Sequence, residues 1–158
     1  MDVRIRAIRP EDKALLSWGL TQLSETTVQR RFLSPKPRFT AGELRYLTEV
    51  DGHDHVAFVA EDEDGDLLGV GRFVRLADDP AAAELAVVVA DPFQGQGVGT
   101  LLGQRLTDEA ARHGVHRFTA TMLSENRAAH ALMAKLSQRL ERRLSGRGTS
   151  ELSASLAA

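Results

Sequence analysis

Residues 83–100 read AELAVVVADPFQGQGVGT, and this stretch decides the fold. Its first eight residues form the most apolar run in the chain, which is typical of a strand near the centre of a sheet and covered on both faces. Asp91 and Pro92 end that run. A glycine-rich segment follows, and from Val98 apolar residues recur at helical spacing until Gly114. The sequence therefore predicts a central strand, a tight turn and a helix in direct succession.

The glycine-rich turn has the composition of a diphosphate-binding site. Glycines let the backbone aim several N–H groups at one point, and the start of the helix adds partial positive charge there. A dinucleotide fingerprint requires GxGxxG, and neither Gly95 nor Gly97 is followed by glycines at both required positions. A Walker loop requires a lysine, and none is near. The pattern that remains is Gln94-x-x-Gly97-x-Gly99.

The segments that precede residue 83 alternate between strand and helix patterns. We expect an opening strand over residues 3–8, helical segments over 11–23 and 25–33, a helix after the capping-box pair Thr40 and Glu43, and a hairpin formed by 55–61 and 67–76. The acidic residues 62–66 do not match the EF-hand spacing, so we interpret them as a solvated turn rather than a calcium site.

The segments after this unit predict a strand over residues 116–121 and a helix from Asn126. The end of the chain allows two interpretations. Residues 140–144 alternate before Gly146-Arg147-Gly148, which favours a terminal hairpin with 151–156, and a helix that continues to about Leu144 is the alternative.

Composition narrows the class of protein. The chain has 158 residues, and we interpret 1–158 as a single domain. Its net charge of -2 gives no general field for nucleic acid. It has no cysteine, which fits a reducing compartment, and its five histidines show no metal-ligand spacing. No signal peptide or membrane span is evident. We expect a cytoplasmic protein that uses no metal, nucleic acid or membrane.

The glycine turn and its strand resemble the acetyl-CoA signature of the GNAT superfamily, which is written Q/R-x-x-G-x-G/A. This resemblance implies an α/β (α+β) GNAT fold, with a mixed sheet of about six to seven strands flanked by about four helices, and acetyl-CoA as cosubstrate. It implies that the strand holds the pantetheine arm and the turn holds the pyrophosphate. The residues implied are Val87, Val88, Val89, Gln94, Gly95, Gln96, Gly97, Val98, Gly99 and Thr100.

A second segment, residues 126–135, is similar to the family pattern N-x-x-A-x-x-L-Y-x-K and adds Asn126 and Ala129 to the implied cofactor site. Met133 stands where the family often has a tyrosine that protonates the leaving thiolate, so no general acid is assigned. A place in the core is the alternative for Met133. Ser137-Gln138 replaces the usual Gly-Phe, which leaves the course of the last strands open.

The segments 31–33, 56–60 and 83–87 look like the catalytic domain of bacterial Pat-type protein lysine acetyltransferases. This resemblance implies a protein lysine as the acceptor. A small amine, such as a polyamine, aminoglycoside or amino acid, is the alternative acceptor, and a non-catalytic acyl-CoA-binding module is the alternative function. The chain begins at the first strand of the acetyltransferase fold, so we expect no nucleotide-sensing domain. We expect a monomer or homodimer.

Glu84 is the candidate catalytic residue. A lysine ammonium has a pKa of roughly 10.4, so acyl transfer needs a proton acceptor within reach. Glu84 is the only charged residue between Ala81 and Ala90, and burial there would make it a stronger base. The matching residue of the Pat-type family is regarded as the general base. A strand-end carboxylate that faces water is the alternative interpretation.

Two further expectations concern the reaction and the remaining charged residues. A backbone N–H near Val87 would meet the oxyanion, and without a cysteine the amine would attack directly. His53 and His55 are interpreted as surface histidines, with an acceptor channel as the alternative. The basic run Arg139, Arg142, Arg143 and Arg147 is interpreted as a solvated face, with an acidic partner as the alternative.

Overall fold

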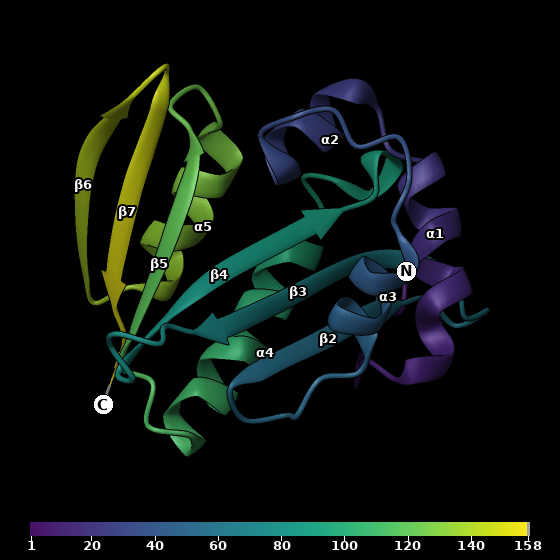
Figure 1. Cartoon of the computed structure of the whole chain (residues 1–158), viewed down its shortest axis with the longest axis horizontal. Coiled ribbons are helices and arrows are strands. Elements are labelled where there is room, and N and C mark those ends of the chain that lie inside the picture. The colour runs from purple at the N-terminus through teal and green to yellow at the C-terminus, as the bar shows by residue number, and fades with distance from the viewer. Residues whose placement is uncertain (158) are drawn as a thin grey trace.

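The computed structural model describes residues 1–157 and folds them into seven strands, five α-helices and two 3₁₀ turns (Figure 1). The elements in chain order are β1 (Arg4–Ala7), η1 (Pro10–Asp12), α1 (Lys13–Thr21), α2 (Glu25–Phe32), α3 (Ala41–Thr48), β2 (His55–Glu61), β3 (Leu67–Arg75), β4 (Ala82–Val89), η2 (Asp91–Phe93), α4 (Val98–Arg112), β5 (Arg117–Leu123), α5 (Arg127–Leu136), β6 (Arg139–Gly146) and β7 (Thr149–Ser155).

All seven strands lie in one sheet, in the order β1-β2-β3-β4-β5-β7-β6. Every neighbouring pair is antiparallel except β4 and β5, which are parallel. The sheet is therefore mixed, and β4 lies in its middle. This architecture confirms the fold class that the glycine turn implied.

The parallel pair at the centre is short. Only Ala82–Glu84 of β4 pair with Arg117–Thr119 of β5, whereas β5 pairs with β7 along its whole length. Beyond Glu84 the two central strands diverge, and Figure 1 shows β4 and β5 running apart from their shared end. Among residues 1–157, no strand pairs with the backbone edges of β4 and β5 that face this opening.

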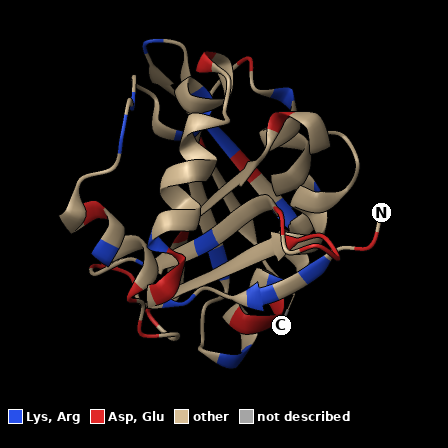
Figure 2. Cartoon of the chain, turned by 90° about the vertical axis from the view of Figure 1, so that its right-hand side faces the viewer, with Lys and Arg blue, Asp and Glu red and all other residues tan. Residues whose placement is uncertain are grey.

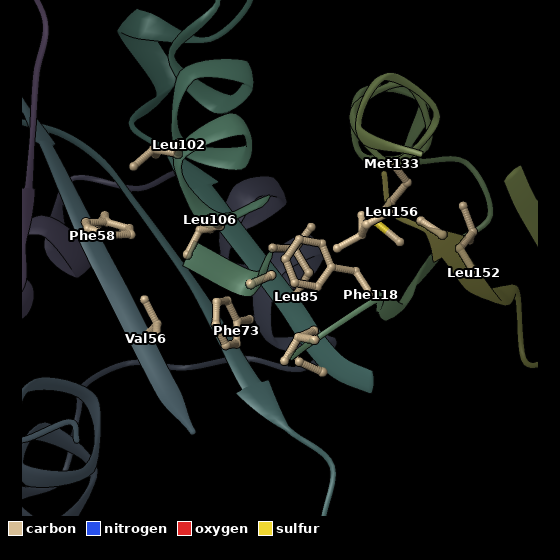
Figure 3. Close-up of a cluster of buried hydrophobic side chains, with 14 of the residues drawn as sticks. Val56, Phe58, Phe73, Leu85, Leu102, Leu106, Phe118, Met133, Leu152 and Leu156 are labelled. Carbon is tan, nitrogen blue, oxygen red and sulfur yellow. The ribbon is translucent and has the colours of Figure 1, made fainter. Parts of the chain in front are cut away.

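Two apolar clusters cover the two faces of the sheet. Helix α4 packs on the face that carries Phe73 and Phe118, whose ring centroids lie 5.7 Å apart, and Leu102 and Leu106 of α4 are fully buried there (Figure 3). The helix can approach closely because β3 carries Gly71, where a Cβ would lie 2.9 Å from Leu106 Cδ1. On the opposite face, a second cluster packs α1 and α3 against β2 and β3.

Local signals place the helix starts. Thr40 Oγ1 accepts a hydrogen bond from Glu43 N at 3.1 Å and Glu43 Oε1 accepts one from Thr40 N at 2.9 Å, so the predicted capping box of α3 is confirmed. The predicted helical segments before it correspond to η1 with α1 and to α2. The chain ends in the β6–β7 hairpin, so the alternative of a helix that continues to Leu144 is wrong. Gly146 and Gly148 adopt positive φ at the tight turn and favour the hairpin.

Among residues 1–157, no helix is long and apolar enough to cross a membrane. Figure 2 shows that lysine and arginine positions are interspersed with aspartate and glutamate positions over the fold, with long uncharged segments between them.

Candidate active site

The turn between β4 and α4 adopts the backbone conformation that its glycines allow. Gly95 has φ 76° and Gly97, the N-cap of α4, has φ 87°, a region that other L-residues rarely adopt. A Cβ built on either glycine meets no atom within 4 Å. The turn thus presents open space in front of the first N–H groups of α4, where partial positive charge favours an anion.

A cleft of about 370 Å³ runs from this turn into the opening between β4 and β5. It is lined by β4, β5, α5, the turn and the inner side of α2. The cofactor residues implied by sequence that line it are Val87, Val88, Val89, Gln94, Gly95, Gly97, Val98, Gly99, Thr100, Asn126 and Ala129. Gln96 and Glu84 do not line it. Eleven of the twelve implied cofactor residues, taken from three segments, therefore meet around one cavity.

The side chains of Gln94 and Gln96 brace the turn. Gln94 Nε2 donates to the Val89 carbonyl at 3.0 Å and to Thr27 Oγ1 at 3.2 Å. Gln96 Nε2 donates to the Pro92 carbonyl at 3.1 Å. These contacts fix the path of the backbone, which leaves the turn amides as the groups that meet a ligand.

Asp91 joins the turn to the start of α2. Its carboxylate accepts hydrogen bonds from Ser24 N at 3.1 Å, Ser24 Oγ at 2.7 Å and Thr27 Oγ1 at 2.9 Å. Burial opposes ionisation of Asp91, but these hydrogen bonds outweigh it and hold the pKa below its ordinary value. No local sequence pattern indicates this contact, because its partners lie 64 to 67 positions apart.

Helix α5 closes the other side of the cleft. Asn126 caps this helix, because its Oδ1 accepts from Ala129 N at 3.2 Å. Met133 is 1% exposed and belongs to the main apolar cluster, and Figure 3 draws its side chain close to Leu156. The core interpretation of Met133 is therefore confirmed, although one side of this residue also lines the cleft.

Glu84 occupies the last paired position of β4 before the strands diverge, opposite Thr119. Its side chain is exposed, so the expected burial is wrong. Within residues 1–157, α5 packs on β6 and β7 and covers only one face of that half of the sheet. The other face, which carries Glu84, is a hollow of about 580 Å³ lined by β4, β5, β6 and β7.

His55 is buried at 8% exposure, so its interpretation as a surface histidine is wrong, whereas His53 is exposed as expected. Arg72 Nη1 lies 2.9 Å from His55 Nε2 and donates to the Leu47 carbonyl at 3.0 Å. A guanidinium has only donors, so the imidazole nitrogen accepts. Burial and the charge of Arg72 lower the pKa of His55 to about 4. The Tyr46 ring packs against the imidazole at 4.8 Å.

The basic run lies on β6, an edge strand whose eight residues are all exposed. Arg143 forms an ion pair with Glu151 at 2.7 Å and Arg139 one with Glu141 at 3.5 Å. The solvated-face interpretation of Arg139, Arg142 and Arg143 agrees with this exposure. Arg147 is exposed in the hairpin turn.

A family model described as "Acetyltransferase (GNAT) family" matches residues 22–137. The chain belongs to this GNAT family. The matched range runs from the end of α1 through α5 and includes the whole cleft, so the GNAT assignment covers the residues that form the candidate site. Membership identifies the chain as an acetyl-CoA-dependent N-acyltransferase domain.

Three known proteins extend the comparison. "Acetyltransferase Pat" of Mycolicibacterium smegmatis is 36% identical over 133 residues, and the match covers 84% of this chain and 40% of that protein. The GNAT domain of S. lividans PAT has a crystal structure with a TM-score of 0.87 and 28% identity, covering 98% of this chain and 90% of that one. The structure of yncA from Salmonella typhimurium with its cofactor acetyl-CoA has a TM-score of 0.76 and 22% identity, and the match covers 100% of this chain and 96% of that one. The Pat-type resemblance is confirmed, and this GNAT chain spans less than half the length of the mycobacterial relative.

The residues of the cleft suit acetyl-CoA on grounds of their own. An anion can approach the turn because Gly95 and Gly97 place no Cβ before the helix start. An extended amide-containing arm can pair with the free edges of β4 and β5, which no strand occupies beyond Glu84. The apolar side chains along the cleft suit the methylene groups of that arm.

Proposed function

We propose that this GNAT domain transfers the acetyl group of acetyl-CoA to the side-chain amine of a protein lysine, with Glu84 as the general base. The observation that carries the proposal is the position of Glu84. It stands where β4 and β5 separate, between the cofactor cleft and the open hollow on the other face of the sheet. A thioester in the cleft and an amine from the hollow would meet beside it.

Backbone groups do most of the cofactor binding in this proposal. The N–H groups of residues 94–100 hold the pyrophosphate, and the strand edge at Val87 and Val89 pairs with the pantetheine amides. Asn126 and Ala129 confine the arm from α5. The cleft geometry supports this division, since Val87, Val89 and the turn line one continuous cavity. A backbone N–H near Val87 donates to the carbonyl oxygen of the thioester as negative charge develops there.

The chemical step is direct attack. The lysine ammonium first loses one proton to solvent. The neutral amine nitrogen then forms a bond to the thioester carbon, and the tetrahedral intermediate collapses with cleavage of the C–S bond. Glu84 accepts the proton that the nitrogen loses, either directly or through one water. An exposed carboxylate is sufficient for this role, because the nitrogen becomes far more acidic once it has bonded to the carbonyl carbon. The departing thiolate takes a proton from solvent, since Met133 offers none.

Two observations favour a protein acceptor over a small amine. The chain is 36% identical to a Pat acetyltransferase over 84% of its length. The hollow beside Glu84 is wide and open, and its rim is formed by side chains of four strands, which leaves room for a folded protein to present a lysine. A small amine would gain few contacts there.

The test is transfer of isotope-labelled acetyl from acetyl-CoA to a bacterial lysate and, separately, to a panel of polyamines, aminoglycosides and amino acids. We expect label on protein lysines, located by mass spectrometry. Label only on small amines would contradict the lysine acceptor. Binding of CoA without transfer to any acceptor would favour a non-catalytic module.

The base is tested with Glu84→Gln, which should lower kcat by roughly 100-fold or more and leave the Kd for CoA within about twofold. Glu63→Gln is the control, because it removes an exposed carboxylate that lines neither the cleft nor the hollow. An unchanged kcat in Glu84→Gln would contradict the role of Glu84. We also propose a cytoplasmic location, where acetyl-CoA is available, and fractionation of the native host would test it.

A further inference from the structure

A separate apolar pocket of about 190 Å³ lies beside the candidate active site. Its floor is the sheet at β3 and β4, and its walls come from α1, α2 and α3 and the loops that follow them. The apolar lining includes Leu16, Leu20, Phe32, Phe39, Leu47 and Val88. In the described part of the chain, the only charged residues that line it are Arg31 and Arg72.

Arg31 connects this pocket to the cofactor cleft, because it lines both cavities. Its guanidinium lies 4.8 Å from the centre of the Phe32 ring. No hydrogen bond or ion pair joins it to any other residue within 1–157. Burial lowers the pKa of Arg31, and the negative charge of Glu84 partly offsets this effect.

Arg72 supplies the second cation from the floor. It is 6% exposed and uses Nη1 for the Leu47 carbonyl and His55. Neither contact carries negative charge. Burial and, next, the charge of Arg31 lower the pKa of Arg72 to about 10, so Arg72 is still protonated at neutral pH. A guanidinium does not lose its proton in proteins, so Arg31 is a cation as well and the two groups repel each other.

Two neighbouring cations in apolar surroundings are unfavourable without an anion. Glu84 opposes only part of this charge, because its effect on Arg31 is smaller than that of burial and the described residues contain no ion pair between Glu84 and either arginine. A planar guanidinium matches a carboxylate better than any other common anion of metabolites and proteins, apart from phosphate. A phosphate would be too strongly hydrated for so apolar a lining, so the lining favours a carboxylate attached to an apolar group.

We propose that Arg31 and Arg72 form a carboxylate-binding subsite, so that the preferred acceptor carries a carboxylate and an apolar group next to its reactive amine. This inference rests on the proposed acetyl transfer and specifies its acceptor. In a protein, the carboxylate belongs to an aspartate or glutamate beside the lysine, and a neighbouring apolar side chain enters the pocket. In a free apolar amino acid, both groups belong to the same molecule.

The experiment compares peptide acceptors that differ only in the charge of one residue, and it adds two free amino acids. The first pair of end-blocked peptides is Ala-Leu-Lys-Glu-Ala and Ala-Leu-Lys-Gln-Ala. A second pair places the glutamate or the glutamine directly before the lysine instead of after it. Free leucine and free phenylalanine are the two further probes. We expect a glutamate peptide to have a kcat/KM at least tenfold above its glutamine counterpart, mainly through KM. Calorimetry with the enzyme–CoA complex should give the same preference in Kd.

Variants then assign the preference to the arginines. Arg31→Gln should reduce the ratio between the two peptides to about twofold or less, and Arg72→Lys should reduce it partly, because it keeps the charge and loses the planar fork. Arg38→Gln is the matched control, since it removes an exposed arginine that lines neither cavity. Circular dichroism and CoA affinity confirm that each variant is folded.

The outcomes separate this inference from the proposed function. Equal kcat/KM for both peptides of each pair would overturn the subsite, while leaving lysine transfer intact. Transfer to leucine or phenylalanine alone, lost in Arg31→Gln, would support the subsite and overturn the protein acceptor. Wild-type enzyme that acetylates none of these probes and no lysate protein would overturn both.

Discussion

The glycine turn lies on one side of α2, and the apolar pocket that contains Arg31 and Arg72 lies on the other. The two regions are built in opposite ways. The turn consists of consecutive residues whose backbone conformation creates the site, and its Gly95 and Gly97 contribute by having no side chain. The pocket combines side chains from α1, α2, α3, β3 and β4, and its chemistry comes from Arg31 and Arg72.

This difference predicts how each region responds to change. A site made of backbone N–H groups tolerates many side chains but not an added Cβ at a left-handed position. Binding at a site made of buried side chains depends on each side chain that forms the site and on its charge. The Asp91 carboxylate, bonded to Ser24 and Thr27, is the direct link between the two regions.

The largest effect is expected from Gly97→Val. The side chain would force a strained backbone at φ 87° and fill the open space before α4. We expect the Kd for CoA to rise at least 100-fold, about 3 kcal/mol, measured by calorimetry. Gly52→Val is the matched control. Gly52 has φ 81° and equally open surroundings, and it lies far from the turn in the sequence. Equal loss of CoA binding in both variants would show that strain alone is responsible.

The second effect concerns the pocket region and is measured as the pH dependence of stability, through His55, which contacts Arg72. His55 is neutral when folded because its pKa is about 4, against roughly 6.5 in the unfolded chain. The unfolded chain therefore takes up this proton first, and stability that is complete above about pH 6.5 is lost as the pH falls toward 4. Urea denaturation should give a free energy of unfolding lower by about 2 kcal/mol at pH 5 than at pH 7.5. His55→Gln should remove most of that difference, and an unchanged difference would contradict the assignment.

The third effect tests the link between the regions. Asp91→Asn replaces a carboxylate that only accepts hydrogen bonds with an amide that must also donate, so the start of α2 should loosen. We expect kcat/KM for the acceptor to fall by about tenfold, near 1.4 kcal/mol, and CoA affinity to change less. Asp51→Asn changes a similar loop-capping carboxylate at the start of β2 and serves as the control. A larger loss of CoA affinity than of acceptor kcat/KM would contradict the link through α2.

The smallest effect concerns Met133, which is packed in the core on the cofactor side. Met133→Leu conserves volume and should cost less than about 1.5 kcal/mol of stability, measured by thermal unfolding. Turnover should stay within about twofold, because no proton passes through the sulfur. A kcat loss above tenfold in a stably folded variant would give this position a chemical role.

The sequence was sufficient for features that depend on neighbouring residues. The strand, turn and helix around Gly97 and the capping box at Thr40 follow from local backbone preferences. At the end of the chain the sequence leaves two alternatives open, a hairpin at Gly146 or a longer helix, and the structure decides for the hairpin. The family resemblance then identified most of the cleft lining, because those residues also lie in three short segments.

Features that depend on distant packing were missed or misjudged. The sequence predicts burial for Glu84, but the side chain is exposed because one face of β5, β7 and β6 is left open. This exposure depends on the register of those strands, which no local sequence pattern indicates. The sequence predicts a surface histidine at position 55 and misses its burial, because the partner Arg72 lies 17 positions away. An arginine inside the apolar run of β3 was the one local signal of a buried polar contact.

Calorimetric titration of the wild-type domain with dephospho-CoA and with pantetheine tests the central claim most directly. Both ligands carry the arm, and dephospho-CoA adds the diphosphate and an adenosine. The same two titrations of Gly97→Val therefore separate the two groups, because only the turn is changed there. If the turn amides hold that diphosphate, dephospho-CoA binds at least 100-fold more tightly than pantetheine. Equal affinity for the two ligands, or no heat with either, would contradict the assignment of the turn.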